Sequence, residues 1–115
     1  MLSMRPGQAL QLWQKSLLAQ VRDDDPDLTM RQLTILLTIY LDPPPHTVRG
    51  LAQHLGVTKP VITRALDTMG IMGLVSRRRD ERDKRNVLIQ RTVEGSQYLE
   101  RLGDIVTEQA TQVTL

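Results

Sequence analysis

The sequence predicts a mainly α-helical domain with one small β-hairpin, and three observations lead to this fold class. Apolar residues recur at the three- and four-residue spacing of amphipathic helices over most of the chain. Gly56 stands between two short helical patterns, where a glycine commonly ends a helix. After Gly73, two short runs rich in Val, Leu and Ile flank a loop, residues 78–86, whose side chains are almost all charged. Helix, turn, helix, strand, charged loop and strand, in this order, predict a winged helix-turn-helix.

The first two helices are predicted from apolar periodicity over residues 8–21 and after Thr29. The acidic run between them, residues 23–27, is expected to form a solvated loop, and a metal site is the alternative that its proline disfavours. Thr29 and Gln32 form a capping box at the start of the second helix. Three prolines, residues 43–45, end that helix and are expected to form a stiff connector. The buried face of the second helix is predicted to consist of Leu33, Leu36, Leu37 and Tyr40.

Two short helices follow and meet at Gly56. Thr47 is expected to cap the third helix, whose inward side chains are Val48, Leu51, Ala52 and Leu55. Thr58 is expected to cap the fourth helix, which tolerates Pro60 in its first turn. Its inward side chains are predicted to be Val61, Ile62, Ala65, Leu66, Met69 and Met72.

Length and composition predict one domain over residues 1–115 with a winged core over residues 28–92. Helices over residues 7–22 and 93–113 flank that core. No apolar run approaches the roughly 18 residues of a membrane span, and the N-terminus lacks a secretory pattern. The absence of cysteine excludes disulfides and thiolate metal sites. We therefore expect a cytoplasmic protein with neither a membrane nor a cofactor as partner.

Charge is distributed unevenly along the chain. Residues 46–91 hold ten basic and four acidic side chains, a net charge of +6, whereas the rest of the chain has a net charge of −4. The aromatic residues Trp13, Tyr40 and Tyr98 all lie outside the basic segment. Proteins that bind single strands usually stack bases on aromatic rings. The pattern therefore favours double-stranded DNA as the partner.

Two groups of residues are the candidate DNA contacts. The fourth helix carries short polar and basic side chains that suit a major groove, namely Thr58, Lys59, Pro60, Thr63 and Arg64. The charged loop and its flanks suit a minor groove or the DNA backbone through Arg77, Arg79, Arg82, Asp83, Lys84 and Arg85. Taken alone, either group could be the solvated face of a surface element. Their adjacency favours DNA binding.

These motifs resemble the MarR family of bacterial winged-helix regulators. The matching segments are L-A-x-x-L-G-V-T-K-P-x-I-T-R-x-L-D at residues 51–67, G-L-V-x-R at 73–77, D-K-R at 83–85 and T-x-x-G at 92–95. The resemblance covers about residues 28–102. It implies a homodimer on a pseudo-palindromic site, with the fourth helix in a major groove. It also implies that Arg85 enters the adjacent minor groove and that Asp83 steadies it, in a bacterial, nucleoid-associated protein.

The chain departs from the family pattern in two respects. Family members usually carry a further C-terminal helix that interlocks the dimer, whereas this chain stops at Leu115. Gly70 is unusual near the end of the fourth helix and is expected to loosen it. In the family, small aromatic or acidic effectors lodge between the dimer helices and the winged domain. An effector is left open here, and no residue is nominated for it.

The first and last helices carry apolar stripes that need a partner. Thr92 is expected to cap the last helix, whose stripe is Tyr98, Leu99, Leu102, Ile105, Val106 and Val113. The stripe of the first helix could pack on the last helix of the same chain or interleave with a second chain, which is the favoured alternative. The expected dimerisation residues are Leu10, Trp13, Leu17, Leu99, Leu102 and Val106. A two-fold pairing would space the reading helices roughly 34 Å apart.

Catalytic motifs are absent from the sequence. It contains no P-loop, G-x-S-x-G or H-E-x-x-H, and His46 and His54 have no carboxylate at ligand spacing. We therefore expect no enzyme. The competing function class is a winged helix that binds another protein, because a fold does not dictate a function. Such a module would expose apolar residues in place of the basic loop.

Overall fold

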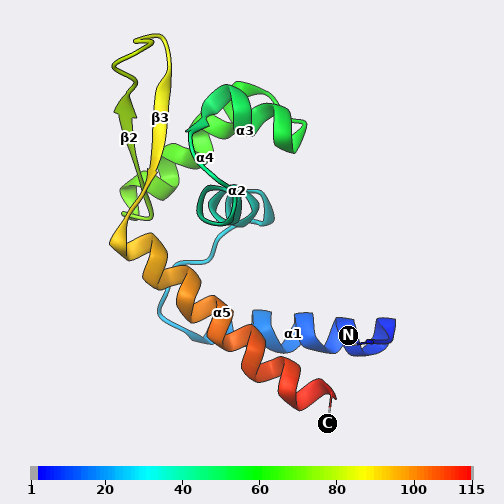
Figure 1. The fold of residues 1–115 in the computed structure, drawn as a ribbon. Coiled ribbons are helices and arrows are strands. Elements are labelled where there is room, and N and C mark those ends of the chain that lie inside the picture. The colour runs from blue at the N-terminus through cyan, green and yellow to red at the C-terminus, as the bar shows by residue number, and fades with distance from the viewer. Residues whose placement is uncertain (1–2, 115) are drawn as a thin grey trace. The chain divides into compact units, whose positions relative to one another are not determined.

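The computed structural model describes residues 3–114 (Figure 1). In order, the elements are α1 (Pro6–Arg22), α2 (Met30–Leu41), β1 (His46–Thr47), α3 (Val48–Leu55), α4 (Lys59–Ile71), β2 (Val75–Arg79), β3 (Val87–Arg91) and α5 (Val93–Thr114). Two compact units result. We call residues 28–97 the winged unit. The terminal unit consists of α1, the loop up to Asp27 and α5 from Tyr98 onward.

The core of the winged unit forms around α2. Ile35, Leu36 and Ile39 are fully buried, whereas Leu33, Leu37 and Tyr40 are only partly buried. The predicted buried face was therefore right at Leu36 and only partly right at Leu33, Leu37 and Tyr40, and it missed Ile35 and Ile39. The helix is apolar around most of its circumference, so periodicity alone does not reveal its inner side. The contacts of α2 with α4 and β3 decide it.

Side chains and glycines mark the helix ends. The capping box at α2 is confirmed: Thr29 Oγ1 accepts the Gln32 amide at 3.0 Å, and Gln32 Oε1 accepts the Thr29 amide at 2.9 Å. Gly56 ends α3 with a left-handed φ of 70°. The predicted side-chain cap at Thr58 was wrong, although Thr58 is the N-cap residue of α4. The next-but-one residue is proline, which has no amide to donate, and the Val61 amide binds the Thr58 carbonyl at 3.1 Å instead.

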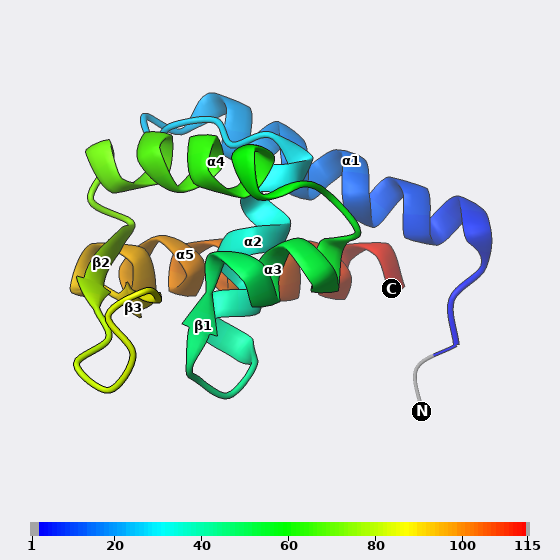
Figure 2. The ribbon, with the colours of Figure 1, turned by 90° about the horizontal axis from the view of Figure 1, so that it is seen from above.

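Three antiparallel strands form a sheet in the order β1-β3-β2. Val75 pairs with Arg91 at one end of the hairpin and Arg79 with Val87 at the other, so the strands extend further into the basic segment than the sequence predicts. The sequence also does not predict β1, whose two residues pair with Ile89 and Leu88 after the proline connector. A two-residue strand leaves no periodicity to detect. Figures 1 and 2 show the hairpin extending past α3 and α4 as an arm of the winged unit.

A polar cluster joins α2, the start of β2 and the start of α5. The Tyr40 hydroxyl accepts the Thr92 amide at 2.8 Å and donates to the Leu74 carbonyl at 2.8 Å. Thr92 caps α5 as predicted, because its Oγ1 accepts the Gly95 amide at 2.9 Å. A Cβ atom at Gly95 would collide with the Tyr40 hydroxyl and the Leu74 carbonyl. The T-x-x-G segment thus closes the winged unit, and only glycine fits at its fourth position.

The terminal unit is joined at the acidic loop. Arg101 Nε donates to Asp25 Oδ2 at 2.8 Å, so this part of the loop is paired with α5. The buried Tyr98 hydroxyl lies 3.4 Å from both Gln20 Oε1 and the Pro26 carbonyl, and burial raises the pKa of Tyr98. None of the helices within residues 3–114 has the length and apolar character needed to cross a membrane.

Candidate nucleic-acid interface

Helix α4 has one buried and one open side. Its core-facing side chains are Ile62, Ala65, Leu66 and Met69. The predicted DNA contacts Thr58, Lys59, Pro60 and Arg64 are exposed, and Thr63 is half-buried. Because the apolar side is packed against α2 and α3, the polar side is held in a defined orientation in the winged unit. The open side ends in the exposed Asp67 and Thr68.

The C-terminal end of α4 leads directly into the wing. Gly73 has a left-handed φ of 77°, and the Leu74 amide reaches back to the Met69 carbonyl at 2.9 Å. This is the Schellman pattern that lets a chain leave a helix sharply. The helix continues through Gly70 to Ile71. The turn at Gly73 therefore sets the direction in which β2 leaves α4.

Arg77 is tied to α4 by an ion pair. Its Nη2 atom lies 2.6 Å from Asp67 Oδ1, and the two side chains are 36% and 55% exposed. The sequence nominates Arg77 as a DNA contact in the wing. In the structure its guanidinium connects β2 to the C-terminal half of α4. An ion pair this exposed contributes about 0.2–1 kcal/mol, enough to bias the hairpin without dominating the fold.

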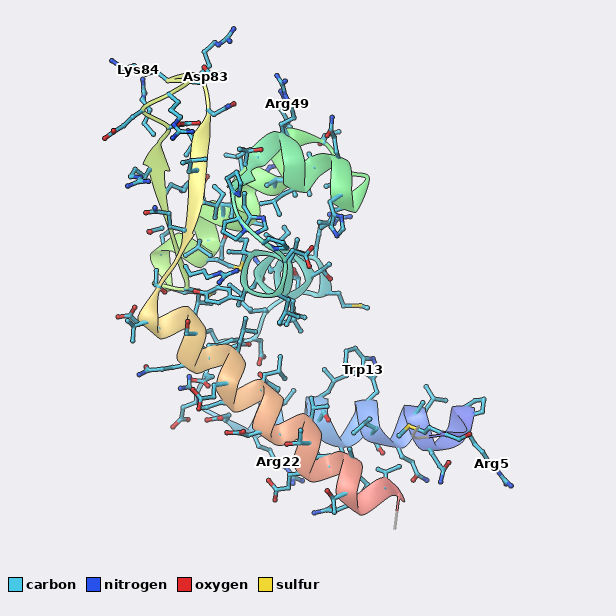
Figure 3. The ribbon with its side chains drawn as sticks, viewed as in Figure 1. Arg5, Trp13, Arg22, Arg49, Asp83 and Lys84 are labelled. Atoms are coloured by element: carbon cyan, nitrogen blue, oxygen red, sulfur yellow. The ribbon has the colours of Figure 1, made fainter. Side chains whose placement is uncertain are left out.

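The wing loop, residues 80–86, is held by its own carboxylates and main chain. The Asp80 amide binds the Asn86 carbonyl at 3.1 Å, which closes the loop above the strands. The Asn86 amide binds the Asp83 carbonyl at 2.9 Å, and the Arg82 amide binds Asp80 Oδ1 at 2.9 Å. Asp83 and Lys84 mark the far end of the hairpin (Figure 3). The acidic residues of the loop therefore shape it, besides reducing its charge.

Asp83 holds Arg85 at the tip of the wing. Its Oδ1 atom accepts the Arg85 amide at 3.2 Å and Nε at 3.1 Å, and its Oδ2 atom lies 3.4 Å from Nη2. The Arg85 guanidinium beside it lowers the pKa of the Asp83 carboxyl, so Asp83 is charged at neutral pH. Arg85 nevertheless remains 91% exposed. It is a charged, oriented and accessible side chain at the tip.

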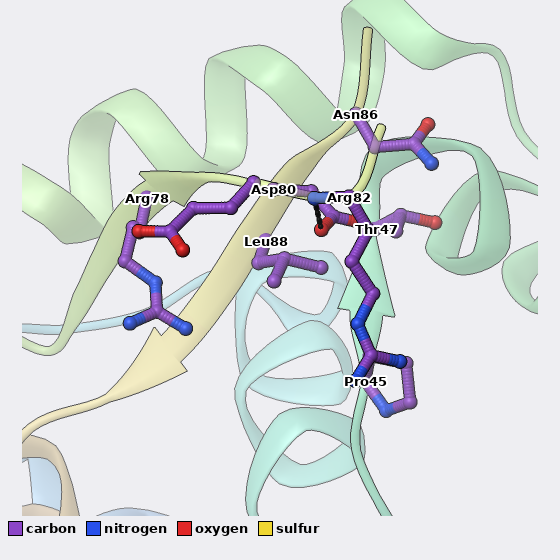
Figure 4. A pocket seen from close by; sticks show the side chains of 8 residues that line it. Pro45, Thr47, Arg78, Asp80, Arg82, Asn86 and Leu88 are labelled. Atoms are coloured by element: carbon purple, nitrogen blue, oxygen red, sulfur yellow. Dashed lines mark hydrogen bonds between the residues drawn. The ribbon is translucent and has the colours of Figure 1, made fainter. Parts of the chain in front are cut away.

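Arg79, Arg82 and Lys84, the other nominated wing cations, are exposed. Arg82 and Arg78 line an open hollow of about 410 Å³ on the sheet, beside Asp80 and Glu81 (Figure 4). Two arginines and two carboxylates make this hollow close to neutral. It therefore lacks the uncompensated charge that a polyanion would select.

Arg91 belongs to the basic segment of the sequence but has a structural role. Its Nε donates to the Ile39 carbonyl at 2.9 Å and its Nη2 to the Asp42 carbonyl at 3.1 Å. Its guanidinium also lies 5.8 Å from the centre of the Tyr40 ring. The net charge of the segment thus overstates how many cations are free to meet a ligand.

The start of α4 and the tip of the wing border one groove of about 200 Å³. Lys59 contributes from α4, Arg85 from the wing and Arg49 from the first turn of α3. The sequence does not single out Arg49, because only the tertiary structure brings α3 beside the wing. Arg49 projects at the same end of the winged unit as Asp83 and Lys84 (Figure 3). The groove joins the two predicted DNA-binding elements.

Both histidines lie near Asp42, and one of them, His54, lies near its carboxylate. His54 Nε2 is 4.0 Å from Asp42 Oδ2, and His46 Nε2 is 3.2 Å from the Asp42 carbonyl. The sequence spacing does not reveal the contact between His54 and Asp42, because the chain folds back after α2. Across the described residues, no group of three or more His, Asp or Glu side chains is placed to hold a metal ion.

Several solved structures share this fold. They include the transcriptional regulator Tm0710 from Thermotoga maritima, with 21% identity, a TM-score of 0.75, and coverage of 92% of this chain and 72% of that one. A MepR–DNA complex from S. aureus has 23% identity, a TM-score of 0.71, and coverage of 89% and 78%. Overoxidized AbfR bound to DNA has 26% identity, a TM-score of 0.66, and coverage of 85% and 67%. These similarities confirm the predicted winged helix-turn-helix fold.

Sequence comparison identifies the family. No curated protein matches the chain. The family model described as the MarR family matches residues 28–87, more than half of the chain and most of the winged unit. The resemblance inferred from the motifs is thereby confirmed, and this chain belongs to the MarR family.

Proposed function

We propose that this chain is a double-stranded DNA-binding transcription regulator and not an enzyme. The open side of α4 enters a major groove, and the tip of the wing enters the adjacent minor groove. Regulation of this kind would take place on the bacterial nucleoid, in the cytoplasm. The proposal assigns base reading to Thr58, Lys59, Pro60, Thr63 and Arg64, and minor-groove or backbone contact to Arg79, Arg82, Lys84 and Arg85.

One observation carries the proposal: the start of α4 and the tip of the wing border the same cationic groove. A helix that reads bases and a loop that reaches a neighbouring groove must act on one side of the molecule. Arg85 is oriented by Asp83 yet almost fully exposed, as insertion into a narrow, electronegative groove requires. The DNA complexes of AbfR and MepR, which share this fold, support the same partner.

The competing function, binding to another protein, predicts apolar residues at this place. The exposed large apolar residues of the winged unit are Met30, Leu41, Ile71, Val87 and Val93. Of these, only Val87 borders the groove, and cations surround it. The chemistry of the groove therefore favours a polyanion.

Fluorescence anisotropy with a labelled duplex selected from random sequence tests the proposal. Affinity should fall by about 10³-fold between 50 and 200 mM salt if about six phosphates are contacted. Arg85→Ala should weaken binding by about 1–3 kcal/mol, or roughly 5- to 150-fold, with an unchanged circular dichroism spectrum. Arg22→Ala, which removes an exposed charge from α1, is the matched control. Binding that ignores salt would refute the DNA proposal and favour a protein partner.

We also propose that the chain acts as a homodimer on a pseudo-palindromic site. The α1 face expected to pack against another helix is open: Leu10, Trp13 and Leu17 are 68%, 51% and 43% exposed. Leu18 and Val21 add to this apolar surface. Monomeric proteins rarely leave such contiguous apolar surface in water. A second copy, supplying the same helices through a two-fold axis, would cover it.

Sedimentation velocity at tens of micromolar tests the dimer. The wild-type chain should sediment as a dimer, and Trp13→Glu should shift it to monomer because the substitution places a charge in the apolar interface. Gln53→Glu adds the same charge at an exposed position of α3, outside the terminal helices, and should leave the dimer intact. A monomeric wild-type protein at this concentration would contradict the pairing of the terminal helices.

A further inference from the structure

The proposed function does not say which part of the DNA lies in the groove between α3, α4 and the wing. It is lined by Thr47, Val48, Arg49, Lys59, Arg85, Asn86 and Val87, so three side chains are cationic and none is acidic. The hollow on the sheet in Figure 4 differs in this respect, because two carboxylates there balance two arginines. Of the pockets described above, this groove has the stronger attraction for a negatively charged group.

Two of the three cationic side chains that line this groove are free to bind a ligand. Arg49 and Lys59 are exposed, and neither has a hydrogen-bond or ion-pair partner among residues 3–114. Arg49 also lies close enough to the tip of the wing for its charge to help lower the pKa of Asp83, after the larger effect of Arg85. The first turn of α3 and the wing tip therefore share one electrostatic environment.

The geometry of DNA indicates which part of the duplex would face this groove. A major groove and the adjacent minor groove are separated by one sugar-phosphate strand. A protein with α4 in the first and the wing in the second must straddle that strand. The surface between the start of α4 and the tip of the wing, which is this groove, then faces backbone phosphates. Guanidinium groups bind phosphate through paired, charge-assisted hydrogen bonds.

We propose that this groove seats one DNA phosphate, bound by Arg49 together with Lys59 and Arg85, which makes α3 a third DNA-contacting element. The inference rests on the proposed DNA-binding function and adds to it a contact outside α4 and the wing. Arg49 is a positioning residue in this role. It sets the register of the protein on the backbone and carries no base information.

Salt dependence and sequence dependence together test Arg49. Binding is measured by anisotropy with the selected duplex and with a shuffled duplex of equal length. Arg49→Ala should weaken binding to both by the same factor and lower the slope of log K against log salt by about 0.9 for each protomer, or about 1.8 for the dimer, the value for one phosphate per half-site. Arg49→Lys should retain most of the slope because it keeps the charge. Thermal unfolding of each variant checks the fold, and Arg49→Gln replaces any variant that unfolds.

Neutral backbone linkages then locate the contact. Methylphosphonates placed one at a time along both strands should reveal one position in each half-site where wild-type binding weakens and where Arg49→Ala binding weakens much less. Arg22→Ala should keep the wild-type profile. If the wild-type chain binds neither duplex, the proposed function itself fails. If it binds while Arg49→Ala keeps the wild-type affinity, slope and profile, the phosphate seat alone is overturned. Weakening on the selected duplex only would also overturn it, because that indicates base reading.

Discussion

Gly95→Ala should destabilise the winged unit severely, although it adds only one methyl group. The new Cβ would overlap the Tyr40 hydroxyl and the Leu74 carbonyl. The Leu74 carbonyl cannot move aside because it belongs to the main chain. Tyr40 would have to leave its 2.8 Å bonds to the Thr92 amide and the Leu74 carbonyl. The hydroxyl would then lose partners that it holds in a partly buried site.

The magnitude follows from two effects. Overpacking costs about 1–3 kcal/mol. Each lost hydrogen bond of this kind costs about 0.5–1.5 kcal/mol. We expect a combined loss of about 2–6 kcal/mol, which at about 4–8 °C per kcal/mol lowers the midpoint of thermal unfolding by roughly 8–48 °C for a unit of this size. Circular dichroism melts at matched protein concentration measure it, because dimerisation makes the midpoint concentration-dependent.

Gly70→Ala is the matched control. It is also a helical glycine of the winged unit, but the nearest atom a Cβ would meet is Arg77 Nη2, at an ordinary 3.9 Å. It should stabilise the protein by about 0.5–1 kcal/mol because alanine favours the helix. In a Tyr40→Phe background the cost of Gly95→Ala should shrink without vanishing, since the Leu74 carbonyl stays in place. A Gly95→Ala protein as stable as the wild type would refute the steric argument.

Two further predictions concern the wing. A double-mutant cycle on Asp67→Ala and Arg77→Ala should give a coupling free energy of about 0.2–1 kcal/mol in urea unfolding, because the pair is half-exposed; zero coupling would mean that the pair does not join the wing to α4. By NMR titration, the Asp83 carboxyl should have a pKa below its ordinary value, and Arg85→Ala should return it toward that value. Because the pKa is lowered, the pair stabilises the folded loop at pH values above the ordinary carboxyl pKa. This stabilisation is lost as the pH falls through the lowered pKa of Asp83. An Asp83 titration unaffected by Arg85→Ala would contradict the observed pairing.

Local sequence was sufficient to predict a structural feature wherever the residues that form it are close together in the chain. Thr29 and Gln32 cap a helix three residues apart, and Gly56 supplies a left-handed turn where a helix must stop. Periodicity found the core side of α4, because that helix has a distinct polar face. The same reasoning failed for α2, whose apolar circumference leaves the choice of buried side to its neighbours.

By itself, then, the sequence determined the order of the elements other than β1, most helix ends, and the fold and family that these imply. The tertiary structure decided which cations are free. Arg77 and Arg91 look like the other basic residues of their segment, yet one pairs with α4 and the other binds main-chain carbonyls near the end of α2. Nothing in the sequence distinguishes Arg49 from the other basic residues, yet its exposed side chain lines the groove beside the tip of the wing. A charge count sums residues along the chain, whereas the availability of a charge depends on partners that folding brings from far away.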